Sequence, residues 1–207
     1  MHKNALIIFV KNPVAGMVKT RLAEGSSIDQ ALEIYLQLLN YTLQICKKLS
    51  NCEKYVFYSD KIDTGDAWAK NGFHQRLQKG TDLGKRMSRA FEEVFSLGHK
   101  NCIIIGSDCP QINTIHLDTA FEKLDNHDAV IGPANDGGYY LLGMKKQHRT
   151  LFENKKWSST SVFLDTLKDL KALQLKTYIL PELIDIDTME DYIAFQQIQE
   201  DSKTGMA

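Results

Sequence analysis

An aspartate that follows a short apolar run is the residue of this sequence best placed to do chemistry. Residues 103–105 are all isoleucine, the run ends at Gly106, and Asp108 comes two positions later. An apolar run bounded by turn residues is typical of a strand buried on both faces, and open α/β sheets bind ligands beyond the carboxyl ends of such strands. A carboxylate there can hold a hard cation and, through it, a phosphate. The alternative is that Asp108 only caps a short helix opening at Pro110.

The loop of residues 11–21 follows the first apolar run, residues 5–10, and carries positive charge. It contains one glycine that permits close backbone approach, Gly16, and three cations: Lys11, Lys19 and Arg21. Such a loop suits a polyphosphate. It is not a Walker A loop, because Val18 stands where the glycine before the lysine is required. The alternative is a basic loop that is simply solvated.

Two further carboxylates, Asp185 and Asp187, lie near the end of the sequence on either side of Ile186. Because Ile186 alternates inward, both aspartates should point the same way. A magnesium ion that binds phosphates commonly takes one or two protein carboxylates, and Asp108 with Asp187 would supply that number. The alternative is that this stretch only opens a helix, capped at Thr188.

Three other stretches are weaker candidates. In residues 132–140, Asn135 and Asp136 with two tyrosines would make a polar pocket for sugar hydroxyl groups, although a double glycine also suits an ordinary hairpin turn. Residues 80–84 offer a helix N-terminus, which favours an anion. Residues 157–160 form a small-residue loop that either closes over a ligand or caps a helix.

Apolar runs alternate with helical patterns along almost the whole chain, which predicts a parallel sheet with helices on both faces. The expected strands are residues 5–10, 55–58, 73–77, 101–105, 128–131, 139–142 and 176–179. The expected helices are residues 29–49, 66–70, 82–97, 114–124, 161–173 and 188–199, the first with its apolar face on Leu32, Leu36, Leu39 and Leu43. The connection at residues 137–138 is so short that the next strand should run antiparallel. We therefore expect a mixed sheet in one domain, residues 1–200, with a frayed tail at 201–207.

Composition excludes several classes of protein. At 207 residues, 43% of them hydrophobic, the chain can bury one good-sized core. A formal net charge of −1 argues against nucleic-acid binding, and no apolar run approaches the ~20 residues of a membrane helix. The first apolar run is also too short for a secretory signal, so we expect a cytoplasmic protein. The cysteines are scattered without zinc spacing: Cys46, Cys52, Cys102 and Cys109.

Five motifs occur together in order along residues 4–195. They are Lys11-Asn12-Pro13 with Gly16-x-x-Lys19-Thr20-Arg21-Leu22, then Asp82-Leu83-Gly84-x-Arg86-Met87, Gly106-Ser107-Asp108-Cys109-Pro110, Gly132-Pro133-x-x-Asp136-Gly137-Gly138-Tyr139-Tyr140, and Asp185-x-Asp187-Thr188-x-Glu190-Asp191. This combination resembles the bacterial nucleotide-diphospho-sugar transferase-like proteins annotated in that family as glycosyltransferases. The family has the GT-A fold, a three-layer α/β/α domain, and is similar to the phospholactate and molybdenum cofactor guanylyltransferases.

The resemblance implies roles for particular residues. Asp108 and Asp187 match the superfamily's metal ligands, for Mg²⁺ or Mn²⁺. The nucleotide and its phosphates are expected on Lys11, Gly16, Lys19, Thr20, Arg21, Asp82, Gly84 and Arg86. The sugar or acceptor is expected on Asn135, Asp136, Gly137, Gly138 and Tyr139. The catalytic residues would then be Asp108, Lys19 and Asp136, the last as a candidate base for an acceptor hydroxyl group.

Three functions stay open at this point. The resemblance places metal-dependent glycosyl transfer from a nucleotide-diphospho-sugar to an unknown acceptor first. Nucleotidylyl transfer, in which a phosphate-bearing acceptor attacks an NTP and releases pyrophosphate, needs the same metal and cations but no base. A nucleotide- or sugar-binding module without turnover is the third.

Overall fold

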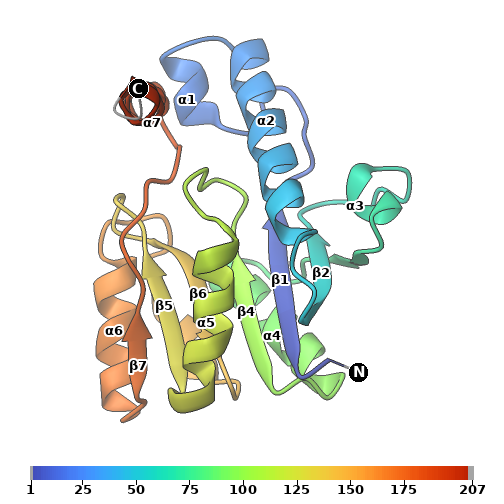
Figure 1. Cartoon of the computed structure of the whole chain (residues 1–207), viewed down its shortest axis with the longest axis vertical. Helices are drawn as coiled ribbons and strands as arrows, with labels where there is room; N and C mark the ends of the chain where they lie inside the picture. The colour runs from blue at the N-terminus through green and yellow to red at the C-terminus, as the bar shows by residue number, and fades with distance from the viewer. Residues whose placement is uncertain (1, 205–207) are drawn as a thin grey trace.

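The strands of this chain form a single seven-stranded sheet in the order β3-β2-β1-β4-β6-β5-β7 (Figure 1). The computed structural model describes residues 2–204, and side chains as far as residue 198. The strands are β1 Asn4–Val10, β2 Cys52–Tyr58, β3 His74–Leu77, β4 Asn101–Ile105, β5 Ala129–Pro133, β6 Tyr139–Met144 and β7 Thr177–Ile179. Only β6 runs antiparallel to its neighbours in this sheet, which confirms the mixed, mostly parallel sheet predicted from the short turn before it.

Helices cover both faces of the sheet, as the alternating pattern predicts. They are α1 Thr20–Glu24, α2 Ile28–Cys46, α3 Ala67–Lys70, α4 Leu83–Ser96, α5 Thr114–Asn126, the 3-10 helix η1 Arg149–Phe152, α6 Val162–Ala172 and α7 Met189–Thr204. The short elements α1 and η1 were not expected. The frayed tail was expected from residue 201, whereas α7 continues to Thr204; residues 205–207 lie outside the described part of the chain.

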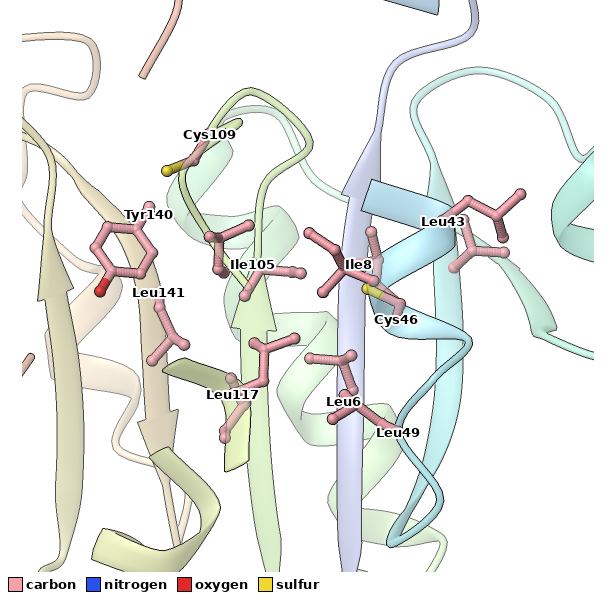
Figure 2. Packing of buried hydrophobic residues seen from close by; sticks show 14 of the residues in the cluster. Leu6, Ile8, Leu43, Cys46, Leu49, Ile105, Cys109, Leu117, Tyr140 and Leu141 are labelled. Atoms are coloured by element: carbon pink, nitrogen blue, oxygen red, sulfur yellow. The ribbon is translucent and has the colours of Figure 1, made fainter. Parts of the chain in front are cut away.

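Two large apolar clusters hold the layers together. One lies between the sheet and helices α2 and α5, and Figure 2 shows part of it, including Leu6, Ile105 and Leu117. The other lies on the opposite face and takes side chains from α4 and α6, among them Phe91 and Leu170. Each fully buried leucine or isoleucine contributes about 1.5–3 kcal/mol relative to exposure, so these clusters fix the strand ends firmly.

A third, smaller cluster stands beyond the carboxyl ends of the strands. Its buried members are Leu22 on α1, Ala31, Ile34 and Leu38 on α2, and Ile186 just before α7. Helix α7 packs against them through the partly buried Met189, Tyr192 and Phe195. Figure 1 shows α1 and α7 together at the top, above the sheet. The predicted apolar face of α2 is wrong at Leu36, which is 47% exposed, because the helix packs on two clusters at once and buries Tyr35 and Leu38 instead.

The strand order places a topological switch between β1 and β4. The chain leaves β1 towards β2 on one side, and returns from β3 to β4 on the other. Connections that diverge in this way open a crevice at the carboxyl ends of the two strands, where α/β sheets bind ligands. The cationic loop and Asp108 both begin at that crevice.

No helix in the described part of the chain is both long enough and apolar enough to cross a membrane.

Candidate functional site

Lys19 joins the three stretches that the sequence singled out. Its ammonium group lies 3.0 Å from Asp108 Oδ2 and 3.1 Å from Asp187 Oδ1, and it donates a hydrogen bond to the carbonyl oxygen of Ile186 at 2.6 Å. The lysine side chain is only 5% exposed, while the two carboxylates keep 38% and 40% of their surface. The first loop, the turn after β4 and the stretch before α7 therefore meet at one point.

The conformation of Lys19 is unusual in two respects. Its backbone has φ 49° and ψ 46°, in the left-handed region that residues other than glycine rarely adopt. Burial lowers the pKa of Lys19, but the charges of Asp108 and Asp187 outweigh that effect and raise the pKa above its ordinary value. The ammonium group is therefore a permanent cation, and strain of this kind is often stored at functional sites.

Asp108 lies in the turn after β4 and caps no helix. The alternative, a helix opening at Pro110, is wrong: α5 starts at Thr114, as expected, and is capped by the side chain of Asn113. The backbone of Asp108 accepts a hydrogen bond from the N–H group of Ile186 at 3.0 Å. The carboxylate of Asp108 forms the ion pair with Lys19 and accepts a long hydrogen bond of 3.4 Å from the Ser107 hydroxyl group. It does not cap a helix.

The stretch before α7 is held by Ile186, which is fully buried in the third cluster. The start of α7 is capped by Thr188 and Asp191, whose side chains and backbone N–H groups bond reciprocally at 2.8 and 3.2 Å. Because these two residues satisfy the helix start, Asp187 remains available for Lys19. Ile186 turns inward, as predicted.

Asp185 is a site residue that the sequence reasoning left without a role. Its Oδ1 atom is buried and has no hydrogen-bond partner among the described residues. Burial, and then the neighbouring charges of Asp108 and Asp136, raise the pKa of Asp185 to about 7. Its backbone N–H group donates to Asn135 Oδ1 at 3.1 Å, so it also touches the turn before β6. The spacing of two residues between Asp185 and Asp187 was the feature of the sequence that could have indicated a role for Asp185 at the site.

The donor set at this point fits a divalent cation with few protein ligands. No group of three or more His, Cys, Asp or Glu side chains that could hold a metal occurs among the described residues. Hard oxygen donors are nevertheless present. Asp108 and Asp187 both form ion pairs with Lys19, and the buried Oδ1 atom of Asp185 has no hydrogen-bond partner among the described residues. Mg²⁺ commonly takes one or two carboxylates and leaves its other positions to phosphate and water.

The remaining cations of the first loop lie at the surface. Arg21 Nη1 is 3.8 Å from Asp187 Oδ2, with its side chain 63% exposed, so it reaches the same carboxylate from outside. Lys11, Gly16 and Thr20 are also exposed, at the rim of the crevice. Because these loop residues are exposed, an anion in solution can reach them.

Two residues outside the predicted set hold this loop in place. The hydroxyl group of Tyr35, on α2, accepts from Lys11 N at 2.8 Å, and burial, followed by the charge of Asp108, raises its pKa to about 12. Asn12 is buried, and its Oδ1 accepts from the N–H groups of Asp60 and Lys61 at 3.0 and 3.2 Å. The first loop is thereby tied to α2 and to the loop after β2.

The start of α4 differs from the expected phosphate site. Asp82 caps the helix by accepting from Lys85 N at 2.8 Å, and this bond lowers the pKa of Asp82. Arg86 turns back to Gly80 O at 3.3 Å. A Cβ at Gly84 would stand 2.5 Å from both the Trp157 ring and Phe152 O, so this glycine allows close packing. The anion at the N-terminus of α4 is the carboxylate of Asp82.

The turn between β5 and β6 is also used in packing. A Cβ at Gly137, whose φ is +86°, would stand 2.2 Å from Thr160 O, and Gly137 O accepts from Phe163 N at 2.9 Å. Asp136 is exposed and accepts from Gly138 N at 2.8 Å in a tight local turn. Asn135 is exposed too.

The polar pocket expected from Tyr139 and Tyr140 does not form. Successive residues of a strand point to opposite faces, so Tyr139 reaches Met87 Sδ at 3.8 Å while Tyr140 donates to Pro181 O at 3.0 Å. Burial raises the pKa of both hydroxyl groups. Tyr139, predicted as an acceptor residue, therefore belongs to the core on the α4 side.

The loop at residues 157–160 does not cap α6. Ser161 occupies the N-cap position of that helix, and no side chain caps it there. Ser159 donates instead to Lys156 O at 2.7 Å. The loop packs between Gly84 and Gly137, so it joins α4 to the turn before β6.

Cys109 lies in the turn after β4, beside the site (Figure 2). It is 5% exposed, and burial, then the charge of Asp185, raise its pKa. A thiol held protonated in this way is a poor nucleophile. The four cysteines are buried and free.

Known proteins with similar sequences and structures share this arrangement of the chain. The chain is 29% identical over 192 residues to the 2-phospho-L-lactate guanylyltransferase of Methanocaldococcus jannaschii, covering 89% of this chain and 79% of that protein. A solved structure from Desulfovibrio desulfuricans G20, provisionally described as a nucleotide-diphospho-sugar transferase, superposes with a TM-score of 0.83 at 31% identity, covering 91% and 84% of the two chains.

A more distant structure confirms the fold. The CMP:2-keto-3-deoxy-manno-octonic acid synthetase, solved with CTP, superposes with a TM-score of 0.61 at 10% identity, covering 96% of this chain and 99% of that one. Residues 42–159, more than half of the chain, match the model of the family described as uncharacterized proteins conserved in bacteria, DUF2064. The chain therefore belongs to the DUF2064 family, whose domain has the fold of nucleotide-sugar transferases and nucleotidyltransferases.

Proposed function

We propose that this protein is a metal-dependent nucleotidylyltransferase that joins an NTP to a small acceptor bearing a phosphate group and releases pyrophosphate. The observation that carries the proposal is the convergence of Lys19, Asp108 and Asp187 at the carboxyl edge of β1 and β4. Support also comes from the similarity to 2-phospho-L-lactate guanylyltransferases, whose name describes this reaction on one such acceptor. Glycosyl transfer, placed first on the sequence alone, now stands second.

The residues at the crevice suit a reaction between two anions. An oxygen of the acceptor phosphate attacks the α-phosphorus of the NTP, the bond from that phosphorus to the α–β bridging oxygen breaks, and pyrophosphate leaves with the electron pair. The attacking oxygen is already ionised, so no general base is required. Charge accumulates on the leaving pyrophosphate, and fixed cations aimed at that charge are the protein's main catalytic resource.

Lys19, Arg21 and Lys11 are the cations that would bind the phosphates. Arg21 and Lys11 lie exposed at the rim, where they can attract and orient a polyphosphate before it enters. Thr20 and Gly16, exposed on the same loop, offer a hydroxyl group and an accessible backbone. The carboxylates of Asp108 and Asp187 would hold Mg²⁺ or Mn²⁺, with the orphaned oxygen of Asp185 beside them. When bound, such an ion neutralises phosphate charge as a Lewis acid.

The acceptor would lie on the β6 side of the crevice. Asn135 and Asp136 are exposed there, and the hydrogen bond from Asp185 N to Asn135 Oδ1 connects that turn to the carboxylates. Gly137 and Gly138 shape the turn. The packing of Thr160 on Gly137 keeps it rigid, which helps to hold an acceptor in line with the α-phosphate.

Glycosyl transfer is the second candidate, and the similarity to the structure from Desulfovibrio desulfuricans G20 favours it. In that reaction Asp136 would be the base for an acceptor hydroxyl group. Its Oδ1 already accepts from Gly138 N, which uses one of the two oxygens in the local turn. The other oxygen remains exposed to an acceptor.

Pyrophosphate release with a panel of substrates tests the proposal. The protein is incubated with Mg²⁺ and each of GTP, ATP, CTP and UTP, together with 2-phospho-L-lactate or one of a series of other small phosphomonoesters. We expect pyrophosphate only where NTP and acceptor are both present. Release of a nucleoside diphosphate from nucleotide-sugars, with no pyrophosphate from any pair, would favour glycosyl transfer instead.

A further inference from the structure

The ammonium group of Lys19 is turned into the protein. It donates hydrogen bonds to Ile186 O at 2.6 Å and Asp187 Oδ1 at 3.1 Å, and it forms an ion pair with Asp108 Oδ2 at 3.0 Å. With its side chain only 5% exposed, it has almost no surface to offer a phosphate oxygen. In this conformation Lys19 is poorly placed to bind the nucleotide.

The same two carboxylates are the ones that a divalent cation needs. Mg²⁺ binds oxygen at about 2.0–2.1 Å, so an ion held by Asp108 Oδ2 and Asp187 Oδ1 would stand between these two oxygens. The Lys19 ammonium group occupies that position, 3.0 Å from the first oxygen and 3.1 Å from the second. Two cations cannot occupy it together, because like charges at such a separation repel strongly.

The backbone at Lys19 is strained. Lys19 is the N-cap residue of α1, and its φ of 49° and ψ of 46° lie in the left-handed region. The preceding loop residues 13–17 are exposed, and the loop contains Gly16 with φ +75°. Release of the ammonium group would let the strained backbone relax without disturbing the buried residues Val18 and Leu22 on either side.

We infer that the Lys19 ammonium group and a divalent cation are mutually exclusive occupants of the Asp108–Asp187 pair, so that metal binding displaces Lys19 and frees it for the phosphates. This inference rests on the proposed function and specifies how its site is loaded. The lysine acts as an internal counter-ion that keeps the carboxylates together before the metal arrives. The Lys19 ammonium group, once it leaves the carboxylates, is then free to bind the phosphates of the nucleotide. One exchange thus gives the site both its metal ion and a hydrogen-bond donor for phosphate oxygens.

Chemical labelling of lysines in the unaltered protein tests the exchange directly. The protein is treated with an amine-acetylating reagent, with EDTA or with saturating MnCl2, and acetylation at each lysine is quantified by mass spectrometry. We expect Lys19 to be protected in EDTA and to react at least about fivefold faster with Mn²⁺, because its ammonium group would then be exposed. Unchanged protection of Lys19 at saturating Mn²⁺ would overturn the inference.

Two lysines are internal controls. Lys155 has a side chain that is 2% exposed and ion-paired with Asp169, far from the carboxylates in the sequence and in a different ion pair, so its protection should not respond to Mn²⁺. Lys168 has a side chain that is 76% exposed and should react in both conditions. A rise at Lys19 and Lys155 together would indicate general loosening and would count against the exchange.

Direct measurement of Mn²⁺ binding gives a second test, by the electron paramagnetic resonance signal of free Mn²⁺ and without nucleotide. We expect Lys19→Met to bind Mn²⁺ at least about tenfold more tightly than the unaltered chain, because the competing cation is gone. Arg21→Met, which removes an exposed cation 3.8 Å from Asp187, should change the affinity by no more than about threefold.

Equal or weaker Mn²⁺ binding by a folded Lys19→Met variant would contradict the exchange. Labelling needs no variant, so it decides the matter if Lys19→Met does not fold. Neither measurement uses turnover. A negative result with pyrophosphate release intact would therefore reject only the exchange, and a positive result without any transfer product would reject only the proposed reaction.

Discussion

Two buried lysines in this protein form ion pairs with aspartates, and their surroundings are opposite in kind. Lys155 pairs with Asp169 on α6, one cation with one anion, and its side chain is 2% exposed. Lys19, 5% exposed, faces Asp108 and Asp187 together, with Asp185 close enough to feel their charges. The first pair is one to one. In the second, two carboxylates exceed the charge of the one buried ammonium group, and Arg21 offsets the difference only from the exposed side, 3.8 Å from Asp187.

The backbone around the two lysines differs in the same sense. Lys155 is followed by Trp157, whose ring lies against Gly84 so closely that no Cβ fits between them. Lys19 has a strained left-handed backbone and lies beside an exposed loop. A buried ion pair is thus weak grounds for a function by itself; excess charge, strain and an orphaned carboxylate oxygen together separate a site from a structural pair.

The largest expected difference between the two pairs is in turnover. Asp108→Asn should lower kcat of the proposed reaction by about 10²–10³-fold, because it removes a carboxylate of the proposed metal site and an ion-pair partner of Lys19. Asp169→Asn should leave kcat within about twofold, since it breaks only the remote pair. Both are measured by pyrophosphate release on protein shown to be folded by circular dichroism. Equal losses in the two variants would end the distinction between the pairs.

The stabilities of the two lysine variants should depend differently on metal. Lys155→Met should lose about 2–3 kcal/mol of unfolding free energy, with or without Mn²⁺, because Asp169 is left without a partner yet remains partly exposed. Lys19→Met should lose stability in EDTA and recover much of it with Mn²⁺, which replaces the missing charge. Urea denaturation in both conditions measures this. A Lys155→Met variant rescued by Mn²⁺ would show that the comparison is mistaken.

The packing next to the structural pair can be tested at Gly84. Gly84→Ala should cost about 2 kcal/mol, because the new methyl group meets Phe152 O and the Trp157 ring, each 2.5 Å from its position. Gly84→Ala combined with Trp157→Ala should cost less than the sum of the two changes, since one obstacle is gone. Additive costs in urea denaturation would mean that the ring does not constrain Gly84.

The smallest expected effect concerns Asp185 and pH. Its pKa is raised from 3.8 to about 7, so the folded state binds this proton more tightly than the unfolded state and loses stability as pH rises from about 4 to 7. Without metal, Asp185→Asn should match the unaltered chain near pH 4 and exceed it by about 1–2 kcal/mol at pH 8, a rise of a few degrees in Tm. A constant difference across this range would contradict the buried carboxyl group.

The sequence predicted much of this fold because its signals are local. The apolar run ending at residue 105 predicted the bounds of β4, residues 101–105, and the short turn at Gly137 predicted an antiparallel β6. The predicted face of α2 failed at Leu36, because a helix that packs on two clusters shifts its buried stripe. The periodicity of a helix does not predict which of two apolar clusters, if either, will bury a given leucine.

The site was predictable as a set of loops and not as a geometry. Strand order brings loops to one edge, which identified Lys19, Asp108 and Asp187 as candidates. The bond from Lys19 to Asp187 spans 168 positions, so only the folded chain reveals that the lysine occupies the space between the carboxylates. The resemblance placed Gly84 at the nucleotide. In the structure a side chain at this position would collide with the ring of Trp157, which lies 73 positions later in the sequence.

The fate of the α-phosphate separates nucleotidylyl transfer from glycosyl transfer. The protein is incubated with Mg²⁺, an acceptor phosphomonoester and the NTP that gives the most pyrophosphate, labelled with ³²P at the α-phosphate. We expect label to appear in a new diphosphate-linked product in equal amount to the pyrophosphate released, and we expect Asp108→Asn to suppress both. Label that stays with the nucleotide, while nucleotide-sugars yield nucleoside diphosphate and a glycosylated acceptor, would contradict the proposed nucleotidylyl transfer.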